Sequence, residues 1–217
     1  MRLQSLKDEM QPYVDEILDA PNCRYLSWEH CYNAFGNCKL DADTLALHLG
    51  FYLASWGMYR GSTHLLQRDY KIHIPTVEII KEFKDLRCER NAEITETDIP
   101  RILEVKDKIF NDYQGFKPTD TLITKIILGT LGCVPALDRY FIIGAKSQNI
   151  SGYTLNEKIM NQIFTFIHDK EKEIEKAQNK LKVRGLYYSK MKIVDMYFWQ
   201  LGYRIEKEKE ENRKKKS

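Results

Sequence analysis

The sequence predicts an all-α protein that folds as a single irregular multi-helix domain. Apolar residues recur at spacings of three and four through most of the 217 residues, which is the period of an amphipathic helix. No sustained alternation of apolar and polar residues, the pattern of a half-buried strand, interrupts them. With 43% hydrophobic residues, the composition is typical of a packed core. The length suits one domain with a sizeable core and is too short for two comfortable ones.

The first two predicted helices are marked by a proline, a serine and a glycine. An amphipathic helix over residues 3–17 ends before Pro21. Ser27 is a candidate N-cap, because its hydroxyl can accept a hydrogen bond from a free N–H of the first turn. It precedes a short aromatic helix over residues 28–35, which Gly36 can close.

Two more helices follow on either side of a glycine-containing segment. Asp41 or Asp43 can cap a strongly apolar helix over residues 45–53. Glycines then loosen the chain within residues 56–62. Pro75 fits the first turn of the next helix, where its missing N–H costs nothing.

In the middle of the chain, the sequence predicts three further helices. Thr97 or Asp98, followed by Pro100, starts the first of them, and Thr119 caps the second. Pro135 ends the second run, because proline cannot continue a helix. The three helices are expected at residues 102–109, 122–127 and 136–143.

For the last third of the chain, the sequence predicts a long helix and one final helix. Residues 154–157 have the pattern of a capping box, which begins a helix. We expect the charged second half of this helix, residues 169–182, to project into solvent. Ser189 caps a last helix that Gly202 can end. Residues 206–217 are expected to form a frayed, charged tail.

The net charge of +3 is concentrated at one end. Residues 204–217 contain seven Lys/Arg and four Glu, so residues 1–203 are formally neutral. We therefore divide the chain into one helical domain, 1–203, and a charged tail, 204–217. A non-specific nucleic-acid binder usually carries a basic field over its whole domain. Any contact between this domain and phosphate must therefore be local.

Cofactor, metal and membrane patterns are missing from the sequence. It has no glycine-rich phosphate loop, no dinucleotide fingerprint and no Gly-x-Ser-x-Gly elbow. No apolar run reaches the roughly 20 residues of a membrane span, and the polar start is unlike a secretory signal. The five cysteines form no close pairs, which favours a reduced, cytoplasmic setting. Although His30, Cys31 and Cys38 are zinc-ligand types, a second pair at ligand spacing is missing. We expect neither a metal nor a cofactor.

Residues 115–141 are the one stretch that reads as a chemical site. A helix ends near Tyr113, a turn containing Gly115 and Pro118 follows, and a new helix opens at Thr119. Such a turn can aim backbone N–H groups and a helix N-terminus at a phosphate. Lys117 lies in the turn, where its charge would help.

This segment resembles the helix-hairpin-helix DNA glycosylases. The shared features are the turn between two helices, the threonine near the start of the second helix, and an aspartate just beyond that helix in the sequence Val-Pro-Ala-Leu-Asp, which ends at Asp138. The likeness covers about 30 residues. It departs from the family pattern in having one hairpin glycine and a short loop before Asp138. Lys125 lies inside the helix, whereas the family's nucleophilic lysine stands at its mouth.

The resemblance implies removal of a damaged or modified base from duplex DNA. Asp138 would stabilise positive charge on the sugar, and Lys125 could attack the sugar if its pKa were low. A base must leave the helical stack, so the pocket needs aromatic faces. The remaining candidates fall into two groups: Gly115, Lys117, Thr119, Arg139 and Arg60 for DNA backbone contacts, and Trp28, Trp56 and Tyr59 for the base pocket.

Plainer roles exist for these residues. Asp138 can cap the following helix or pair with a neighbour, and Lys125 can be a solvated helix residue. The hairpin can be only a connection between helices. Asp195, an acid within an aromatic helix, is expected to pair with a buried Lys or Arg.

Two other function classes stay open. One is a non-enzymatic protein-interaction module, suggested by the neutral body and the charged helix after His168. The other is a metal-independent ribonuclease using Arg60 and His64. The leading hypothesis is the DNA glycosylase. By analogy, a bacterial defence against phages that modify their bases would suit such an enzyme.

Overall fold

The computed structural model describes residues 5–61 and 63–215, and this part of the chain is all-α. It contains ten α-helices and five short 3-10 turns, and the only β feature among the described residues is an isolated bridge from Glu89 to Ala92. The α-helices are α1 Leu6–Asp19, α2 Leu26–Phe35, α3 Ala42–Ser55, α4 Ile74–Glu82, α5 Ile99–Asp112, α6 Asp120–Thr130, α7 Arg139–Ser147, α8 Glu157–Asp169, α9 Glu171–Leu181 and α10 Lys190–Lys214. The predicted fold class is confirmed.

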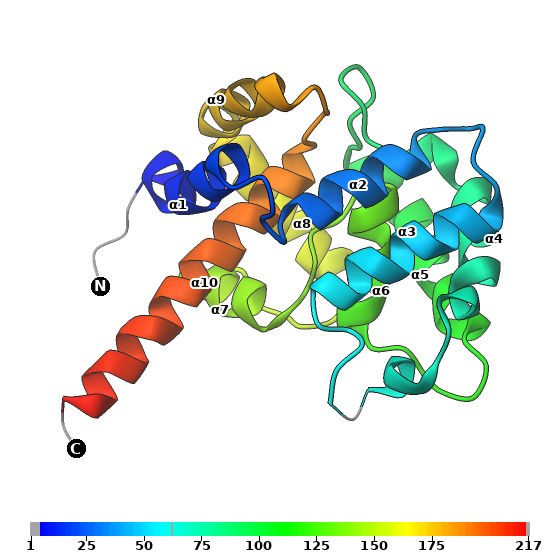
Figure 1. Cartoon of the computed structure of the whole chain (residues 1–217). Helices are drawn as coiled ribbons and strands as arrows, with labels where there is room; N and C mark the ends of the chain where they lie inside the picture. The colour runs from blue at the N-terminus through cyan, green and yellow to red at the C-terminus, as the bar shows by residue number, and fades with distance from the viewer. Residues whose placement is uncertain (1–4, 62, 216–217) are drawn as a thin grey trace.

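The helices form two groups joined through α6, α7 and α8. In Figure 1, α1, α9 and the C-terminal half of α10 lie on one side, and α3, α4 and α5 lie on the other. Helix α7 packs along α10, α2 packs on α3, and α6 contacts both α2 and α3. The loop between α6 and α7 therefore lies where the two groups meet.

Side-chain caps explain where most helices begin. Asp41, Thr119 and Ser189 each accept a hydrogen bond from a first-turn N–H of α3, α6 and α10, as predicted. Ser27 is wrong as a cap, because α2 already begins at Leu26 and Ser27 is buried within it. The predicted capping box at residues 154–157 is also wrong, since Asn156 caps α8 instead.

The helix expected from Ala136 begins three residues later, at Arg139. The backbone N–H groups of Ala136 and Leu137 donate hydrogen bonds to side chains of α10 and α6, and these two residues lie outside the helix. Asp138 then caps α7. Residues 131–138 thus form a fixed loop in place of a first helical turn.

The expected long helix over residues 157–182 is two helices. It breaks at Lys170, and α9 turns back to pack against α1 and α10. Ile174 and Leu181 of α9 are fully buried. The expectation of a projecting charged helix is wrong, because two apolar residues seven apart give this mostly charged segment a buried stripe.

Helix α10 does not end at Gly202 but continues to Lys214. A Cβ at Gly202 would lie 1.8 Å from the carbonyl oxygen of Tyr140, and one at Gly144 would lie 2.1 Å from that of Phe198. These glycines therefore allow α7 and α10 to cross at very close range. The frayed segment expected from residue 206 is helical as far as Lys214.

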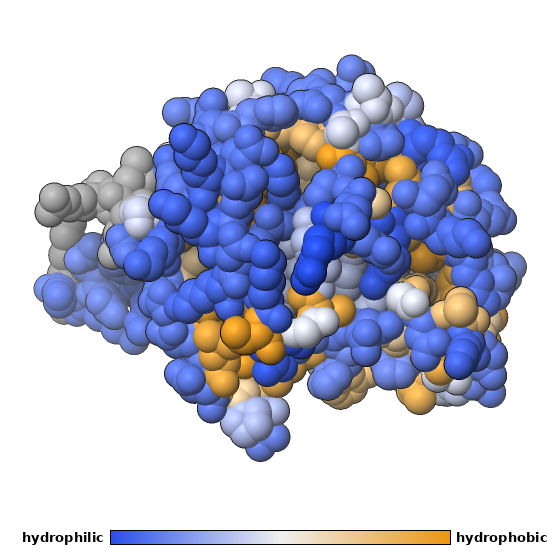
Figure 2. Space-filling model, turned by 90° about the horizontal axis from the view of Figure 1, so that it is seen from above, coloured by the Kyte–Doolittle hydropathy of each residue, from blue (hydrophilic) through white to orange (hydrophobic). Residues whose placement is uncertain are grey.

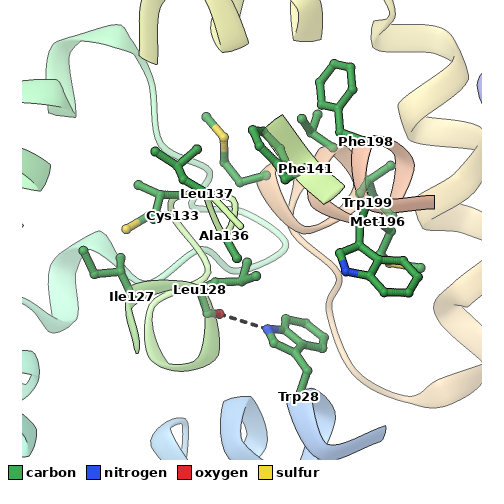
Figure 3. Packing of buried hydrophobic residues seen from close by; sticks show 14 of the residues in the cluster. Trp28, Ile127, Leu128, Cys133, Ala136, Leu137, Phe141, Met196, Phe198 and Trp199 are labelled. Atoms are coloured by element: carbon green, nitrogen blue, oxygen red, sulfur yellow. Dashed lines mark hydrogen bonds between the residues drawn. The ribbon is translucent and has the colours of Figure 1, made fainter. Parts of the chain in front are cut away.

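The core is continuous beneath the loop between α6 and α7. Figure 3 shows Cys133, Ala136 and Leu137 of this loop among buried apolar side chains, with Phe141 of α7 beside Phe198 of α10. It also shows Trp28 of α2 donating a hydrogen bond to the carbonyl oxygen of Leu128. Figure 2 shows a face that is mainly hydrophilic, with apolar groups visible in small patches. Along the described chain, no helix is long and apolar enough to cross a bilayer.

Candidate catalytic site

The two carboxylate oxygens of Asp138 make different contacts. Its Oδ1 accepts hydrogen bonds from the backbone N–H groups of Tyr140 and Phe141, both at 3.1 Å, so it caps α7. Its Oδ2 lies 2.8 Å from Nζ of Lys125. The capping role considered from sequence is therefore real. The carboxylate thus contacts both the N-terminus of α7 and the amine of Lys125.

Lys125 projects from the middle of α6 into the protein interior. Only 3% of its side chain is exposed, compared with 15% for Asp138. The solvated role considered for Lys125 is wrong. Because a buried ammonium group needs a counter-ion, the position of Lys125 inside the helix is what delivers its amine to the carboxylate.

Three side chains from neighbouring helices fix the loop that carries Asp138. Oδ1 of Asp195 accepts the N–H of Ala136 at 3.0 Å, and Oγ1 of Thr124 accepts the N–H of Leu137 at 3.0 Å. The hydroxyl of Thr121 donates to the Leu137 carbonyl at 2.9 Å. Every one of these groups is on α6 or α10, so the loop is held from both sides.

A second ion pair lies beside the first. Nζ of Lys192 is 2.8 Å from Oδ2 of Asp195, with 2% and 8% of the two side chains exposed. The prediction that Asp195 pairs with a buried basic residue is confirmed. Burial lowers the pKa of Lys192, and the charge of Asp195 opposes that shift; the neighbouring Lys125 also lowers it and Asp138 raises it.

Aromatic rings form the wall next to Lys125. Its Nζ lies 4.9 Å from the ring centroid of Trp56. The Trp56 ring stacks on Tyr25 at 5.7 Å and meets Trp199 edge-on at 5.8 Å. Its indole N–H is buried and finds no hydrogen-bond partner among the described residues. Trp56 is therefore the predicted pocket residue that the structure places next to the carboxylate and amine.

The guanidinium of Arg24 covers this aromatic group. Its central carbon lies 5.1 Å from the ring of Trp56, 5.5 Å from Tyr25 and 5.7 Å from Trp199. Arg24 itself is exposed. A long, exposed side chain thus lies over rings that are mostly buried, and its attraction to their faces is a cation–π interaction.

The other two predicted pocket residues are engaged elsewhere. Trp28 is fully buried, its indole N–H is bonded to Leu128, and its ring lies 5.1 Å from Nζ of Lys192. The hydroxyl of Tyr59 is 2.7 Å from Nε2 of His73. Trp28 therefore supports the second ion pair from the core.

Residues 113–119 connect α5 to α6 and contain the predicted phosphate contacts. Gly115 has φ +85°, a conformation that glycine adopts without strain. Lys117 is exposed, and the hydroxyl of Thr119 accepts the N–H of Leu122 to cap α6. Arg68, which the sequence did not single out, supplies the nearest side-chain atom to the Cβ position of Gly115.

The two remaining predicted contacts are both exposed arginines. Arg60 folds back on Gly57, where a Cβ would lie 2.8 Å from its Nε. Arg139 is paired with Glu206 of α10, and 71% of its side chain is exposed. A phosphate contact by Arg139 requires that this surface pair opens, which costs little.

Most of the residues that complete the site gave little signal in the sequence. Arg24 lies in the short segment between α1 and α2, and Lys192 is one of two lysines in the first turn of α10. Thr121 and Thr124 are common helix residues. The pairing of Lys192 with Asp195 at a spacing of three could have been read as a salt bridge on one helix face. Nothing local shows that this face is buried.

Four surface cavities lie elsewhere. One cavity lies between α4 and α5, and another lies between α1 and α9. The other two are both lined in part by Asn37. Across the described residues, no group of three potential metal ligands comes together. None of these four cavities is lined by Asp138, Lys125 or Trp56.

Comparisons with known proteins add no relative. No family model, curated protein or solved structure matches this chain.

Proposed function

We propose that this protein is a DNA glycosylase-like enzyme that removes a damaged or modified base from duplex DNA by hydrolysis of the N-glycosidic bond. The observation that supports the proposal is the pair formed by Asp138 and Lys125 at 2.8 Å. It lies beside the ring of Trp56. A carboxylate, an amine and an aromatic face are the groups that this reaction uses.

The reaction assigns a distinct task to Asp138. As the bond from C1′ to the base nitrogen breaks, its electron pair leaves with the base, which takes up a proton. Positive charge develops on the sugar, and the ionised carboxylate stabilises it. Water then adds to C1′ and loses a proton, which leaves an abasic site.

Lys125 is the ion-pair partner of Asp138 before the reaction. As an ammonium group it donates a hydrogen bond to Oδ2, and it has no lone pair with which to attack the sugar. We therefore expect base removal without strand cleavage. Nucleophilic attack by Lys125 would need loss of this proton first.

The DNA backbone contacts are proposed for four exposed basic side chains. Lys117 and Arg68 lie at the turn between α5 and α6, and Arg60 and Arg139 are also exposed. Because residues 1–203 carry no net charge, we expect DNA affinity that depends on these few contacts. The logarithm of the binding constant falls linearly with the logarithm of the salt concentration, and each phosphate contact makes this slope steeper by roughly one unit.

A panel of labelled duplexes, each with one modified base, tests the proposal. Each is incubated with the protein and then treated with hot alkali, which cuts the strand at abasic sites. Asp138→Asn is the decisive variant, because the amide oxygen can still cap α7 while the charge is lost. We expect abasic sites with the wild type and a loss of roughly a hundredfold or more with the variant. Equal behaviour of the two proteins on every duplex would show that Asp138 is not catalytic.

A further inference from the structure

Asp195 reaches the proposed catalytic loop from a distant part of the chain. It lies on α10, is 5% exposed, and accepts the N–H of Ala136 two residues before Asp138. The residues around this N–H are apolar and buried. Because no water can replace a lost partner there, the hydrogen bond fixes the path of the backbone into Asp138.

The charge of Asp195 is balanced by Lys192, one turn earlier on the same helix. Lys192 is 2% exposed, and its Nζ lies 5.9 Å from the ring of Trp56. Nζ of Lys125 is 4.9 Å from the same ring. Both ammonium groups therefore border one indole, and the two ion pairs share a region of low dielectric where charges act strongly on one another.

We propose that Asp195 is a positioning residue for the reaction assigned to Asp138. It holds the loop through Ala136, and with Lys192 it forms a neutral pair that leaves Lys125 as the partner of Asp138. This role rests on the proposed function. In the proposed reaction, neither Asp195 nor Lys192 touches the sugar or the base.

The chain allows the charge of Asp195 to be changed without removing its hydrogen bond. Asp195→Asn keeps an oxygen for the Ala136 N–H but leaves Lys192 with no counter-ion. Lys192→Met removes the positive charge instead and leaves the carboxylate of Asp195 without a counter-ion. Methionine fills much of the space of the lysine side chain. The double variant Lys192→Met/Asp195→Asn is again neutral and keeps the acceptor. The two single variants therefore change the local charge in opposite directions, and the double variant restores it.

The titration of Asp138, followed by carbon-13 NMR of its carboxyl group, is the readout. The charged or titratable groups within reach of this carboxyl are Lys125, Lys192, Asp195, Tyr52 and the adjacent Arg139. Burial raises the pKa of Tyr52 well above its ordinary value, so it stays neutral. Each single variant thus changes one charge near Asp138.

We expect the midpoint of the Asp138 titration to fall by about one pH unit in Asp195→Asn. In this variant the ammonium group of Lys192 has no counter-ion, and its positive charge favours the carboxylate form of Asp138. The midpoint should rise by a similar amount in Lys192→Met and return to the wild-type value in the double variant. Single-turnover base removal should fall roughly tenfold in each single variant and recover to within about twofold in the double variant.

The matched control is Glu9→Gln, which removes the charge of a different ion pair, that between the buried Glu9 of α1 and Arg204 of α10. It should lower the melting temperature and leave the Asp138 midpoint unchanged. If the midpoints of both single variants stay at the wild-type value or move in the same direction, the positioning role is wrong. If duplexes are processed but the midpoints do not move, only this role fails. If the midpoints move as expected but the wild type processes no duplex, the reaction assigned to Asp138 is wrong.

Discussion

The amine of Lys125 lies 2.8 Å from Oδ2 of Asp138, and only 3% of the lysine side chain is exposed. Lys125 is on α6, whereas Asp138 is the last residue of the loop before α7, and this loop is held by side chains of α6 and α10. Loss of either charge therefore leaves the other without a partner in a largely buried place.

Lys125→Met should destabilise the protein by about 3 kcal/mol, because it removes the partner of a mostly buried carboxylate. The measurement is urea unfolding at pH 7, followed by circular dichroism. The double variant Lys125→Met/Asp138→Asn should recover part of the loss, since no unpaired charge remains. A double variant that is less stable than Lys125→Met would contradict this account of the pair.

Arg24→Ala should make the tryptophan fluorescence easier to quench with acrylamide. The guanidinium covers the rings of Trp56 and Trp199, so its removal opens them to solvent. Arg90→Ala is a control, because Arg90 is an exposed arginine outside this aromatic group. Equal quenching of Arg24→Ala and the wild type would mean that Arg24 does not shield these two rings from solvent.

Gly202→Ala should cost about 3 kcal/mol or more, at the upper end for an added buried methyl group. The new Cβ would stand 1.8 Å from the carbonyl oxygen of Tyr140, so α7 and α10 would have to separate. Unfolding in urea measures the loss, and Gln200→Ala on the same helix is the control for a small change. A stable Gly202→Ala protein would show that the crossing is looser than described.

His73 should make the protein less stable as the pH falls below about 6.5. Burial lowers its pKa to about 4, and its two ring nitrogens are hydrogen-bonded to Tyr59 and Tyr113. The unfolded chain therefore binds the proton first. Stability from this residue is complete above pH 6.5 and decreases by up to about 3 kcal/mol as the pH falls to 4.

Unfolding measured between pH 7 and 4 checks this slope. A histidine-to-glutamine change removes the titrating group, so His73→Gln should flatten this part of the pH dependence, even if it is less stable throughout. His30→Gln, which replaces an exposed histidine, should keep the slope. A His73→Gln protein with the wild-type slope would assign the pH dependence to other groups.

Much of the fold was predictable because helix signals are local. The caps Asp41, Thr119 and Ser189 act within one turn, and the apolar period of three and four marks the buried faces. The errors arose where distant contacts override local signals. Gly202 resembles a helix end, but it is a point of close contact between α7 and α10.

The candidate site was predictable only in part. Asp138 stands out because glycine and proline interrupt the helical pattern before it, and Trp56 is a candidate because a base pocket needs aromatic faces. The partnership of Asp138 with Lys125 depends on the angle between α6 and the following loop, which no local pattern encodes. Arg24 and Lys192 join the site through packing between helices that are far apart in the sequence.

The most direct test of the proposed function is mass spectrometry of the base released from DNA that carries modified bases. The wild type should release a free modified base and leave an equal amount of abasic DNA, and Asp138→Asn, folded to the same extent, should release almost none. Release of no base by the wild type from any modified DNA, or equal release by Asp138→Asn, would contradict the assignment of Asp138 as the catalytic carboxylate.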